Sequence, residues 1–443
     1  MDRVRAAAPD MNQCIPLGLR HTYGGFTTPY QFPTEALLRH LHVLGKTGTG
    51  KSTLLQSLIA GLVKGGEGFA ILDPHGDLAL WALDQIPRGR LEDVVYLDFG
   101  DADFVPALNL VSQSVPRESR PRVASALVAA FRHVWVLSWG PRLEHILYHA
   151  LRLLLDAENV SLVALPRLLV DEAFREGLIR QCDDPFIRGF WETEFDAWDK
   201  RFRAEAIAPI QNKLGQLVAM PAIRHSIGQV KMRVNFRELM DQGRILIVNL
   251  SKGKLGDDAS RLLGALLTSM LSATAMERST VAAEHRKPFI LMMDEAQNFL
   301  SDAMASILSE SRKFGLGLVF SHQYLDQLTP VVRAAVLGNA GTTVAFATSG
   351  EDAEVLAVNS GLFAAKQFAD LPPFTALMKC GHQSASEFRL TLSPPVEEKH
   401  GYRDSIIARC RDHLCSPREK VEARLNRWLA EKHVGPVAGR RRF

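Results

Sequence analysis

Short runs of almost uninterrupted apolar residues recur along the chain, separated by longer amphipathic stretches. Such runs predict strands that are buried on both faces, as in a parallel sheet. They lie at Leu41–Gly45, Phe69–Asp73, Val94–Asp98, Ile245–Leu250, Phe289–Asp294, Leu316–His322 and Thr342–Thr348. Because helical or looping segments separate them, the pattern predicts an α/β protein with a mostly parallel sheet.

The interval between Asp98 and Ile245 is much longer than an ordinary connection between strands. Its apolar residues follow helical spacing, and no alternating run occurs, so we expect an inserted all-α subdomain. The clearest helical face combines Leu143, Ile146, Leu147, Ala150, Leu151 and Leu154, and further helices are predicted at Leu162–Leu169, Phe174–Ile179 and around Trp191–Leu217. Four tryptophans, Trp135, Trp139, Trp191 and Trp198, could stack on nucleic-acid bases, but helical spacing favours a place in the core.

The two ends of the chain differ from this central pattern. Residues 1–40 carry turn signals and little periodicity, which predicts a lead-in packed on the main domain. Near the other end, a helix is expected from Ser416–Glu419 onward, with an apolar stripe that should dock on another surface. The stripe comprises Val421, Leu425, Trp428 and Leu429. The final Arg440–Arg442 is either a contact for nucleic acid or a solvated terminus.

These observations predict a core in two parts around the insert. The expected divisions are a lead-in at 1–40, a first core part at 41–110, the all-α insert at 111–240, a second core part at 241–395 and a helical basic tail at 396–443.

Composition narrows the class of protein. The chain has 443 residues, 47% hydrophobic and 23% charged, which is typical of a globular protein, and its net charge of +3 does not by itself indicate a nucleic-acid binder. The five cysteines are scattered without a C-x-x-C pair, so neither a disulfide framework nor a zinc ribbon is expected. Because no run of about 18 apolar residues occurs, we expect no transmembrane segment and a cytoplasmic protein.

The strongest chemical signal is a phosphate-binding loop between the strand at Leu41–Leu44 and a helix over Thr53–Val63. The loop matches G-x-x-x-x-G-K-[ST], and its expected nucleotide-binding residues are Gly45, Lys46, Thr47, Gly48, Thr49, Gly50, Lys51, Ser52 and Thr53. Glycines let successive N–H groups point at one anion, and the helix N-terminus favours the same charge. Lys51 would reach the β- and γ-phosphates, and Ser52 would offer its hydroxyl to Mg²⁺. The expected ligands are ATP and Mg²⁺.

A second signal lies where the strand at Phe289–Asp294 ends in two carboxylates, as in a Walker B motif. Asp294 can hold Mg²⁺, and Glu295 can act as the general base for an attacking water, which favours hydrolysis over transfer to a substrate. Gln323 ends the next apolar strand and should lie beside Glu295, where an amide can orient water or sense the γ-phosphate.

Arg312 has two interpretations that the residues alone leave open. A helix is expected over Gln297–Lys313, with Leu300, Met304, Ile307 and Leu308 on its buried face. Arg312 near its end either interacts favourably with the helix dipole or serves as an arginine finger in a neighbouring subunit's site.

Together, five strings resemble the HerA/FtsK superfamily, and within it the type IV secretion coupling-protein branch. They are H-V-L-G-K-T-G-T-G-K-S-T-L-L at His42–Leu55, I-L-D-P-H-G-D at Ile71–Asp77, I-L-I-V-N-L-S-K-G at Ile245–Gly253, D-E-A-Q-N-F at Asp294–Phe299 and R-K-F-G-L-G-L-V-F-S-H-Q at Arg312–Gln323. The resemblance implies a RecA-like P-loop ATPase core with an all-α insert, a homo-hexameric ring and ATP-driven movement of DNA, expected to be double-stranded. It also implies that Arg312 is the finger supplied in trans and Gln323 the sensor.

The chain departs from coupling proteins that serve a secretion channel, because those carry N-terminal membrane helices. This favours a DNA translocase, with a relaxase-like or other effector protein as a possible partner. The alternative is an oligomeric ATPase whose nucleotide state regulates a partner nuclease or other effector. An ABC-type ATPase is not favoured, because no L-S-G-G-Q string occurs.

Overall fold

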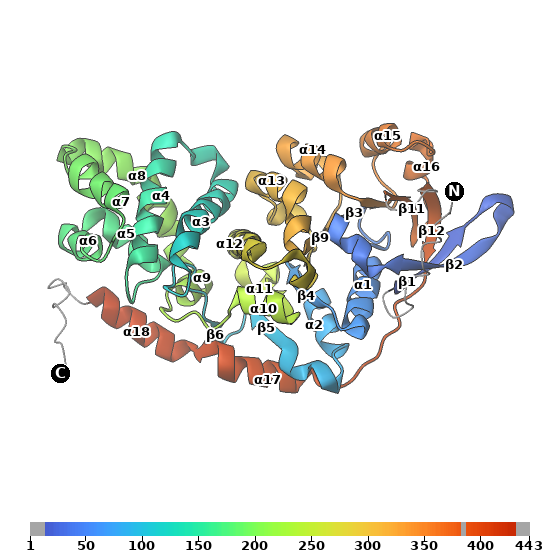
Figure 1. Ribbon diagram of the computed structural model, residues 1–443, viewed down its shortest axis with the longest axis horizontal. Coiled ribbons are helices and arrows are strands. Elements are labelled where there is room, and N and C mark those ends of the chain that lie inside the picture. The colour runs from blue at the N-terminus through green and yellow to red at the C-terminus, as the bar shows by residue number, and fades with distance from the viewer. Residues whose placement is uncertain (1–13, 382–386, 431–443) are drawn as a thin grey trace. The chain divides into compact units, whose positions relative to one another are not determined.

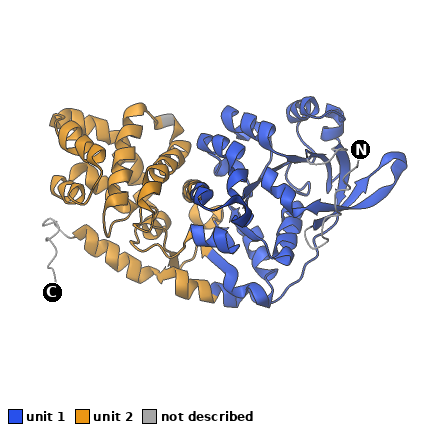
Figure 2. Ribbon diagram, viewed as in Figure 1, with its two compact units in different colours: residues 1–96, 236–249, 274–407 blue, residues 97–235, 250–273, 408–443 orange. Residues whose placement is uncertain are grey.

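The computed structural model describes residues 14–381 and 387–430 (Figure 1). The chain divides into two compact units (Figure 2). Among the described residues, unit 1 holds 14–96, 236–249 and 274–407 without 382–386, and unit 2 holds 97–235, 250–273 and 408–430. Two helices, α12 (Asp257–Glu277) and α17 (Arg403–Leu414), have residues in both units.

The core of unit 1 is a sheet with the strand order β2-β1-β12-β11-β10-β3-β9-β8-β4-β7-β5. The pairs from β10 to β7 are parallel, whereas β11, β12, β1 and β2 extend the sheet in antiparallel pairs. The strands are β1 (Cys14–His21), β2 (Thr27–Pro33), β3 (Leu41–Leu44), β4 (Gly68–Asp73), β5 (Val94–Asp98), β7 (Ile245–Asn249), β8 (Phe289–Met293), β9 (Leu316–His322), β10 (Thr342–Ala345), β11 (Thr375–Cys380) and β12 (Glu387–Leu392).

All seven strands predicted from apolar runs lie in this sheet, so the predicted fold class is confirmed. Every residue of β3, β4, β7, β8 and β9 is buried, which is why these strands appear in the sequence as continuous apolar runs. Residues before 41 show little periodicity in the sequence, yet β1 and β2 form a hairpin that joins the sheet through β12.

The helices of unit 1 connect these strands. Those lying wholly within it are α1 (Lys51–Gly65), α2 (Asp77–Asp84), α10 (Phe236–Gln242), α13 (Asp302–Glu310), α14 (Pro330–Asn339), α15 (Gly350–Asn359) and α16 (Ala365–Ala369). Helix α1 buries Leu54, Leu55, Leu58, Ile59 and Leu62 and ends at Gly66, which adopts the left-handed conformation. Glycine accepts that conformation without the steric cost of a Cβ atom.

Unit 2 consists mainly of helices, as expected for the insert. They are α3 (Arg120–Val134), α4 (Pro141–Asp156), α5 (Leu165–Val170), α6 (Glu172–Ile179), α7 (Pro185–Gly189), α8 (Lys200–Ala219), α9 (Pro221–Ile227), α11 (Lys252–Leu255) and α18 (Arg418–Ala430). Two short strands, β6 (Phe104–Pro106) and β13 (Cys415–Pro417), pair with each other. The predicted apolar face of α4 is buried throughout. The finer domain boundaries given above stay a prediction.

The single helix predicted around Trp191–Leu217 was wrong. A π-helical turn occupies Phe190–Phe195, and α8 begins only at Lys200. The carboxylate of Asp199 accepts hydrogen bonds from the first N–H groups of α8, so it caps a new helix. Trp191 is fully buried and Trp135 nearly so, while Trp139 and Trp198 are half-buried beside other aromatic rings. All four tryptophans therefore contribute to packing within unit 2.

The apolar stripe of the predicted tail helix docks within unit 2. Val421 and Leu425 of α18 are buried, and Leu425 packs where a side chain on Gly228 would otherwise lie. Trp428 is half-buried near Phe174, whereas Leu429 is 62% exposed and was wrongly assigned to the stripe. The predicted contact at Arg440–Arg442 lies outside the described residues.

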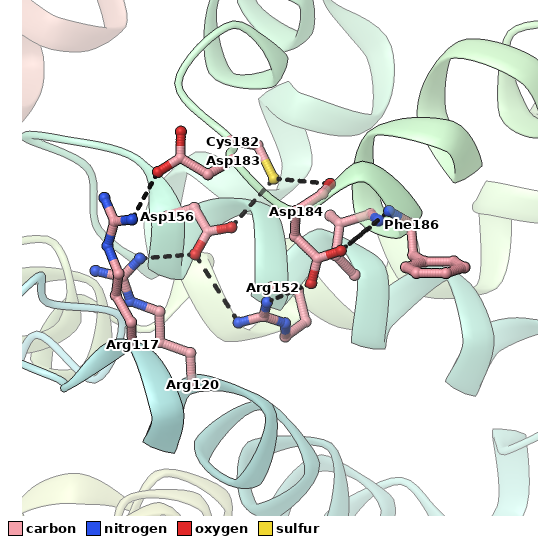
Figure 3. Close-up of polar contacts among 9 residues, drawn as sticks. Arg117, Arg120, Arg152, Asp156, Cys182, Asp183, Asp184 and Phe186 are labelled. Atoms are coloured by element: carbon pink, nitrogen blue, oxygen red, sulfur yellow. Dashed lines mark hydrogen bonds and ion pairs between the residues drawn. The ribbon is translucent and has the colours of Figure 1, made fainter.

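A group of charged side chains joins several helices of unit 2 (Figure 3). Arg120 of α3 donates a hydrogen bond to Asp156 of α4 at 2.8 Å, and the thiol of Cys182 donates to the same carboxylate at 3.1 Å. Arg152 donates to Asp184 at 3.0 Å. Asp184 also caps α7, because its carboxylate accepts from the first N–H groups of that helix. These contacts pair carboxylates with arginines across the helix connections.

In the described part of the chain, no helix combines the length and the apolar character needed to cross a membrane.

Candidate nucleotide and metal site

The loop between β3 and α1 depends on its glycines. Gly48 and Gly50 have φ of 77° and 124°, which residues with a Cβ rarely adopt. A Cβ on Gly45 would lie 2.6 Å from the Cβ of Phe346, so a side chain there would collide with the strand-end segment behind the loop. The loop is further fixed by hydrogen bonds from the N–H groups of Gly45 and Lys46 to the carbonyls of His322 and Ala347.

Lys51 is held by the loop itself. Its ammonium group donates to the carbonyl oxygens of Gly45 at 2.6 Å and Lys46 at 3.1 Å, and the residue is only 8% exposed. Burial lowers its pKa, which the charges of Glu295 and Asp294 partly oppose. The cation is therefore positioned at the loop and has carboxylates close enough to influence its protonation.

The remaining loop residues present polar groups. Thr47 and Ser52 are exposed, while Thr53 is half-buried and its carbonyl accepts a bond within α1. The hydroxyl of Thr49 donates to the carbonyl of Lys46 at 2.7 Å, which closes the loop on itself. The exposed hydroxyl of Ser52 lies at the start of α1, where the helix dipole favours anions.

The carboxylate of Asp73, at the end of β4, lies near that of Asp294, which directly follows β8. Leu72 pairs with Met293 in the parallel register, and the N–H of Asp294 donates to the carbonyl of Leu72 at 3.3 Å. Burial raises the pKa of Asp294, and the charges of Asp73 and Glu295 raise it further, whereas a hydrogen bond with Ser321 lowers it. This group therefore has an unfavourable excess of negative charge when ionised.

Asp73 was not among the predicted site residues. It is fully buried, and its carboxylate accepts from the N–H groups of His75 and Ala79 at 2.8 Å each, which fixes the start of α2. The sequence did contain a sign that Asp73 belongs to the site, because the apolar run of β4 ends in this acidic residue within I-L-D-P-H-G-D. The sequence did not indicate that β4 lies directly beside β8.

Glu295 and Gln323 lie together, as their places at neighbouring strand ends predicted. The amide of Gln323 donates to one carboxylate oxygen of Glu295 at 2.9 Å, and the amide of Gln297 donates to the other at 2.6 Å. Glu295 has a φ of 47°, an unusual left-handed conformation for a residue with a side chain. Its carboxylate is thus aimed by a constrained backbone and two amide donors.

The turn that carries Gln323 is held by two further side chains that the sequence analysis missed. The side-chain oxygen of Gln327 accepts from the N–H groups of Gln323 at 2.9 Å and Tyr324 at 3.2 Å. The ring of His322 contacts the Tyr324 carbonyl through Nδ1 at 3.0 Å and the Nε2 of His42 through its own Nε2 at 2.8 Å.

Both histidines are fully buried, and burial lowers the pKa of His322 to about 4 and that of His42 well below its ordinary value. Each imidazole is therefore neutral and carries one N–H. Because the His322 Nδ1 donates to a carbonyl, its Nε2 accepts the proton of His42. This bond links β3, which precedes the phosphate loop, with the end of β9.

Arg312 does not join these residues within its own chain. The predicted continuous helix is interrupted, since α13 begins at Asp302 after a 3₁₀ turn at Ala296–Asn298, and Arg312 lies exposed in a second such turn. Ile307 is only half-buried. Arg312 precedes β9, whereas Gln323 follows it, so these residues are separated by the length of a seven-residue strand, about 20 Å. Its charge contributes to lowering the pKa of His40, which lies just before β3, although burial is the larger cause.

A depression of about 500 Å³ adjoins the first residues of the loop. Its lining includes Lys46, Thr47, Gln323 and Tyr324, together with the acidic residues Asp326, Glu351 and Asp352. The depression gives the side of the loop that faces Gln323 access to solvent.

The oxygen groups at this edge suit a hard cation. In the described residues, no cluster of three or more His, Cys, Asp or Glu side chains is arranged to hold a metal ion by itself. Mg²⁺ is commonly bound by one or two protein oxygens together with phosphates and water. Asp294, whose ionised form is disfavoured by burial and by the charges of Asp73 and Glu295, and the hydroxyl of the exposed Ser52 fit that kind of site.

Comparison with known proteins supports the resemblance seen in the motifs. Residues 28–99 match the family described as "Helicase HerA, central domain". The type 4 coupling protein DotL of Legionella pneumophila is 23% identical over 353 residues, covering 66% of this chain and 45% of DotL. The chain thus spans less than half the length of this curated relative.

Solved structures share the fold across most of the chain. The plasmid coupling protein TrwB in complex with ADP and Mg²⁺ has a TM-score of 0.63 and 17% identity, covering 90% of this chain and 98% of TrwB. VirB4 of Thermoanaerobacter pseudethanolicus has a TM-score of 0.55 and 14% identity, covering 90% of this chain and all of that one. The fold is therefore the RecA-like P-loop fold of coupling proteins, and the resemblance to HerA-type ATPases is confirmed.

Proposed function

We propose that this chain is an ATP-hydrolysing motor that forms a ring and translocates double-stranded DNA. The observation that carries the proposal is the placement of Lys51, Asp294, Glu295 and Gln323 around one edge of the sheet. DNA as substrate and the hexameric ring come from the resemblance to coupling proteins and HerA. A cytoplasmic location is part of the same proposal.

In this mechanism the loop amides and the N-terminus of α1 bind the phosphates. The ammonium group of Lys51 gives up its hydrogen bonds to the carbonyls of Gly45 and Lys46 and donates to phosphate oxygens instead. Ser52 and Asp294 would hold Mg²⁺ at this edge. Such an ion would supply positive charge that neutralises the β- and γ-phosphates.

Glu295 accepts the proton of the attacking water. Both carboxylate oxygens receive amide hydrogen bonds, which fix the orientation of the carboxylate for that role. Gln323 contacts this base directly, so movement of its turn on nucleotide binding would alter the position of the base. Through this contact the residue acts as the sensor of the γ-phosphate.

Arg312 completes the site of a neighbouring subunit. Its exposure and its distance from Gln323 of the same chain support action in trans. We expect Arg312→Ala to reduce ATP turnover by about 10³-fold or more. Mixing Arg312→Ala with Lys51→Ala should restore part of the turnover, since a Lys51→Ala subunit can lend its arginine to an intact neighbouring site. Equal inactivity of the mixture and its components would contradict the role in trans.

The decisive experiment is ATP turnover with and without long double-stranded DNA. We expect stimulation by DNA and loss of turnover in both Lys51→Ala and Glu295→Gln. Turnover that survives both substitutions would contradict the assigned site. Turnover that is lost in both variants but indifferent to DNA would contradict the DNA motor.

That second result would favour the nucleotide-switched regulator of a partner protein. The apolar stripe of α18 does not add support for such a partner, because Val421 and Leu425 pack within unit 2.

A further inference from the structure

Phe374 has an unusual backbone beside the phosphate loop. Its φ is 60°, and the non-glycine residues with positive φ in the described ranges are His40, Asn159, Glu295 and Phe374. A bulky aromatic residue rarely adopts this conformation, and such outliers concentrate at functional sites. Glu295 and Phe374 both adjoin the loop, on opposite sides.

Two backbone hydrogen bonds hold Phe374 in place. Its N–H donates to the carbonyl of Thr49 at 2.8 Å, and its carbonyl accepts from the N–H of Leu392 at 2.8 Å. The preceding Pro372 and Pro373 restrict the approach of the chain to this turn. The residue is therefore tied both to the phosphate loop and to β12.

The ring of Phe374 is available for contact. The residue is 47% exposed, although the strand that follows is almost entirely buried. A Cβ placed on Gly50 would lie 3.4 Å from the ring carbon Cδ1 and 3.2 Å from the Cα of Phe374. The missing side chain of Gly50 thus lets an exposed aromatic ring lie directly against the end of the loop.

The strand order indicates which end of a nucleotide would meet this ring. The catalytic carboxylates follow β8, and Gln323 follows β9, on one side of β3. On its other side lie β10 and β11, which are antiparallel, so β11 begins at the edge where β10 ends. On the loop itself, the contacts with Phe374 come from its later residues, Thr49 and Gly50.

A triphosphate whose γ-phosphate faces Glu295 must therefore direct its nucleoside end towards β10 and β11. We propose that Phe374 is the platform on which the nucleotide base stacks. This inference rests on the proposed function, because it names a further binding residue of the same site. A phenyl ring has no hydrogen-bonding group, so its contribution is expected to be similar for adenine and guanine.

The test is calorimetric titration of the full chain with ATP, GTP and inorganic tripolyphosphate in the presence of Mg²⁺. Phe374→Gly removes the ring and tolerates the left-handed backbone, while Phe374→Trp retains an aromatic face. Loss of one stacked base corresponds to about a 5- to 150-fold weaker affinity. We expect Phe374→Gly to show this loss for ATP and GTP alike, with tripolyphosphate affinity unchanged, and Phe374→Trp to bind ATP at least as tightly as the parent.

The control is Phe26→Gly, which removes a 73% exposed phenylalanine between β1 and β2, outside the loop. Unchanged ATP affinity in Phe374→Gly would contradict the base platform while leaving the proposed function intact. Equal loss of ATP and tripolyphosphate affinity would also contradict it, because the residue would then only brace the loop. Failure of the parent chain to bind ATP would instead contradict the proposed function itself.

Discussion

Unit 1 and unit 2 each contain a group of carboxylates, and the two groups have opposite surroundings. In unit 2, Asp156 accepts from Arg120 and Cys182, and Asp184 accepts from Arg152 (Figure 3). In unit 1, Asp294 has two other acids, Asp73 and Glu295, as its strongest charged neighbours. One group is balanced by cations of the chain itself, whereas the other carries excess negative charge.

The pKa of Asp184 in unit 2 is lowered, whereas that of Asp294 in unit 1 is raised. Burial alone would raise the pKa of Asp184, but hydrogen bonds from Phe186, Arg152 and Ile187 outweigh it, so its pKa lies below the ordinary value. Burial raises the pKa of Asp294, and its acidic neighbours add to the effect. A carboxylate paired with arginines is part of the scaffold. A carboxylate held near other acids at the edge of a phosphate loop is suited to an external cation.

The largest effect on stability is expected from Asp156→Ala in unit 2. Removing this acid leaves the buried charge of Arg120 without its carboxylate partner, while Arg152 keeps only Asp184. Loss of one partner of a buried ion pair typically costs about 3–5 kcal/mol. Tryptophan fluorescence during urea unfolding can follow this unit, because Trp135, Trp139, Trp191, Trp198 and Trp428 lie in it and only Trp81 lies in unit 1.

Asp183→Ala is the matched control. Asp183 pairs with Arg117 at 2.8 Å, but both side chains are more than 70% exposed, so its loss should cost about 0–1 kcal/mol. Equal destabilisation by the two substitutions would show that the buried pairing of Asp156 is not what stabilises the helices.

A smaller effect of opposite sign is expected from Asp294→Asn in unit 1. The raised pKa means that the folded state disfavours the ionised carboxylate, so neutral asparagine should stabilise the nucleotide-free chain by about 0.5–2 kcal/mol at neutral pH while abolishing turnover. The gain should disappear at a pH below the unfolded-state pKa of about 3.9, where aspartate is protonated in both states. Hydrogen exchange in β4 and β8 can measure it, and lower protection in the variant at neutral pH would contradict the excess negative charge.

The contrast between the units also shows what the sequence can predict. Strands such as β8 and β9 were identifiable because complete burial leaves continuous apolar runs, and Glu295 and Gln323 were placed together because parallel strands end at one edge. The hairpin strands β1 and β2 were not identified, since partial burial and prolines obscure their alternation.

Other parts of the site depend on contacts that no local pattern encodes. Asp73 acquires its place from β4 lying beside β8, although a long stretch of chain separates these strands. The pairing of His42 with His322 likewise follows from the order of β3 and β9. Phe374 approaches Gly50 through a turn before β11, a strand that the apolar runs did not reveal. Motifs thus predicted the residues at each strand end, while strand order determined which of them meet.

The smallest expected effect is that of Asp184→Asn, which changes charge while retaining the cap of α7, because an asparagine oxygen still accepts from Phe186 and Ile187. The lowered pKa means that the aspartate adds stability above its unfolded-state pKa of about 3.9 and loses it as the pH falls through the folded-state pKa. Since the side chain is 35% exposed, the advantage at neutral pH should be below about 1 kcal/mol. Urea unfolding followed by tryptophan fluorescence should show the parent and the variant converging as the pH is lowered towards 2. A difference that is independent of pH would mean that Asp184 stabilises unit 2 through packing and capping, and the contrast with Asp294 would then not be one of charge.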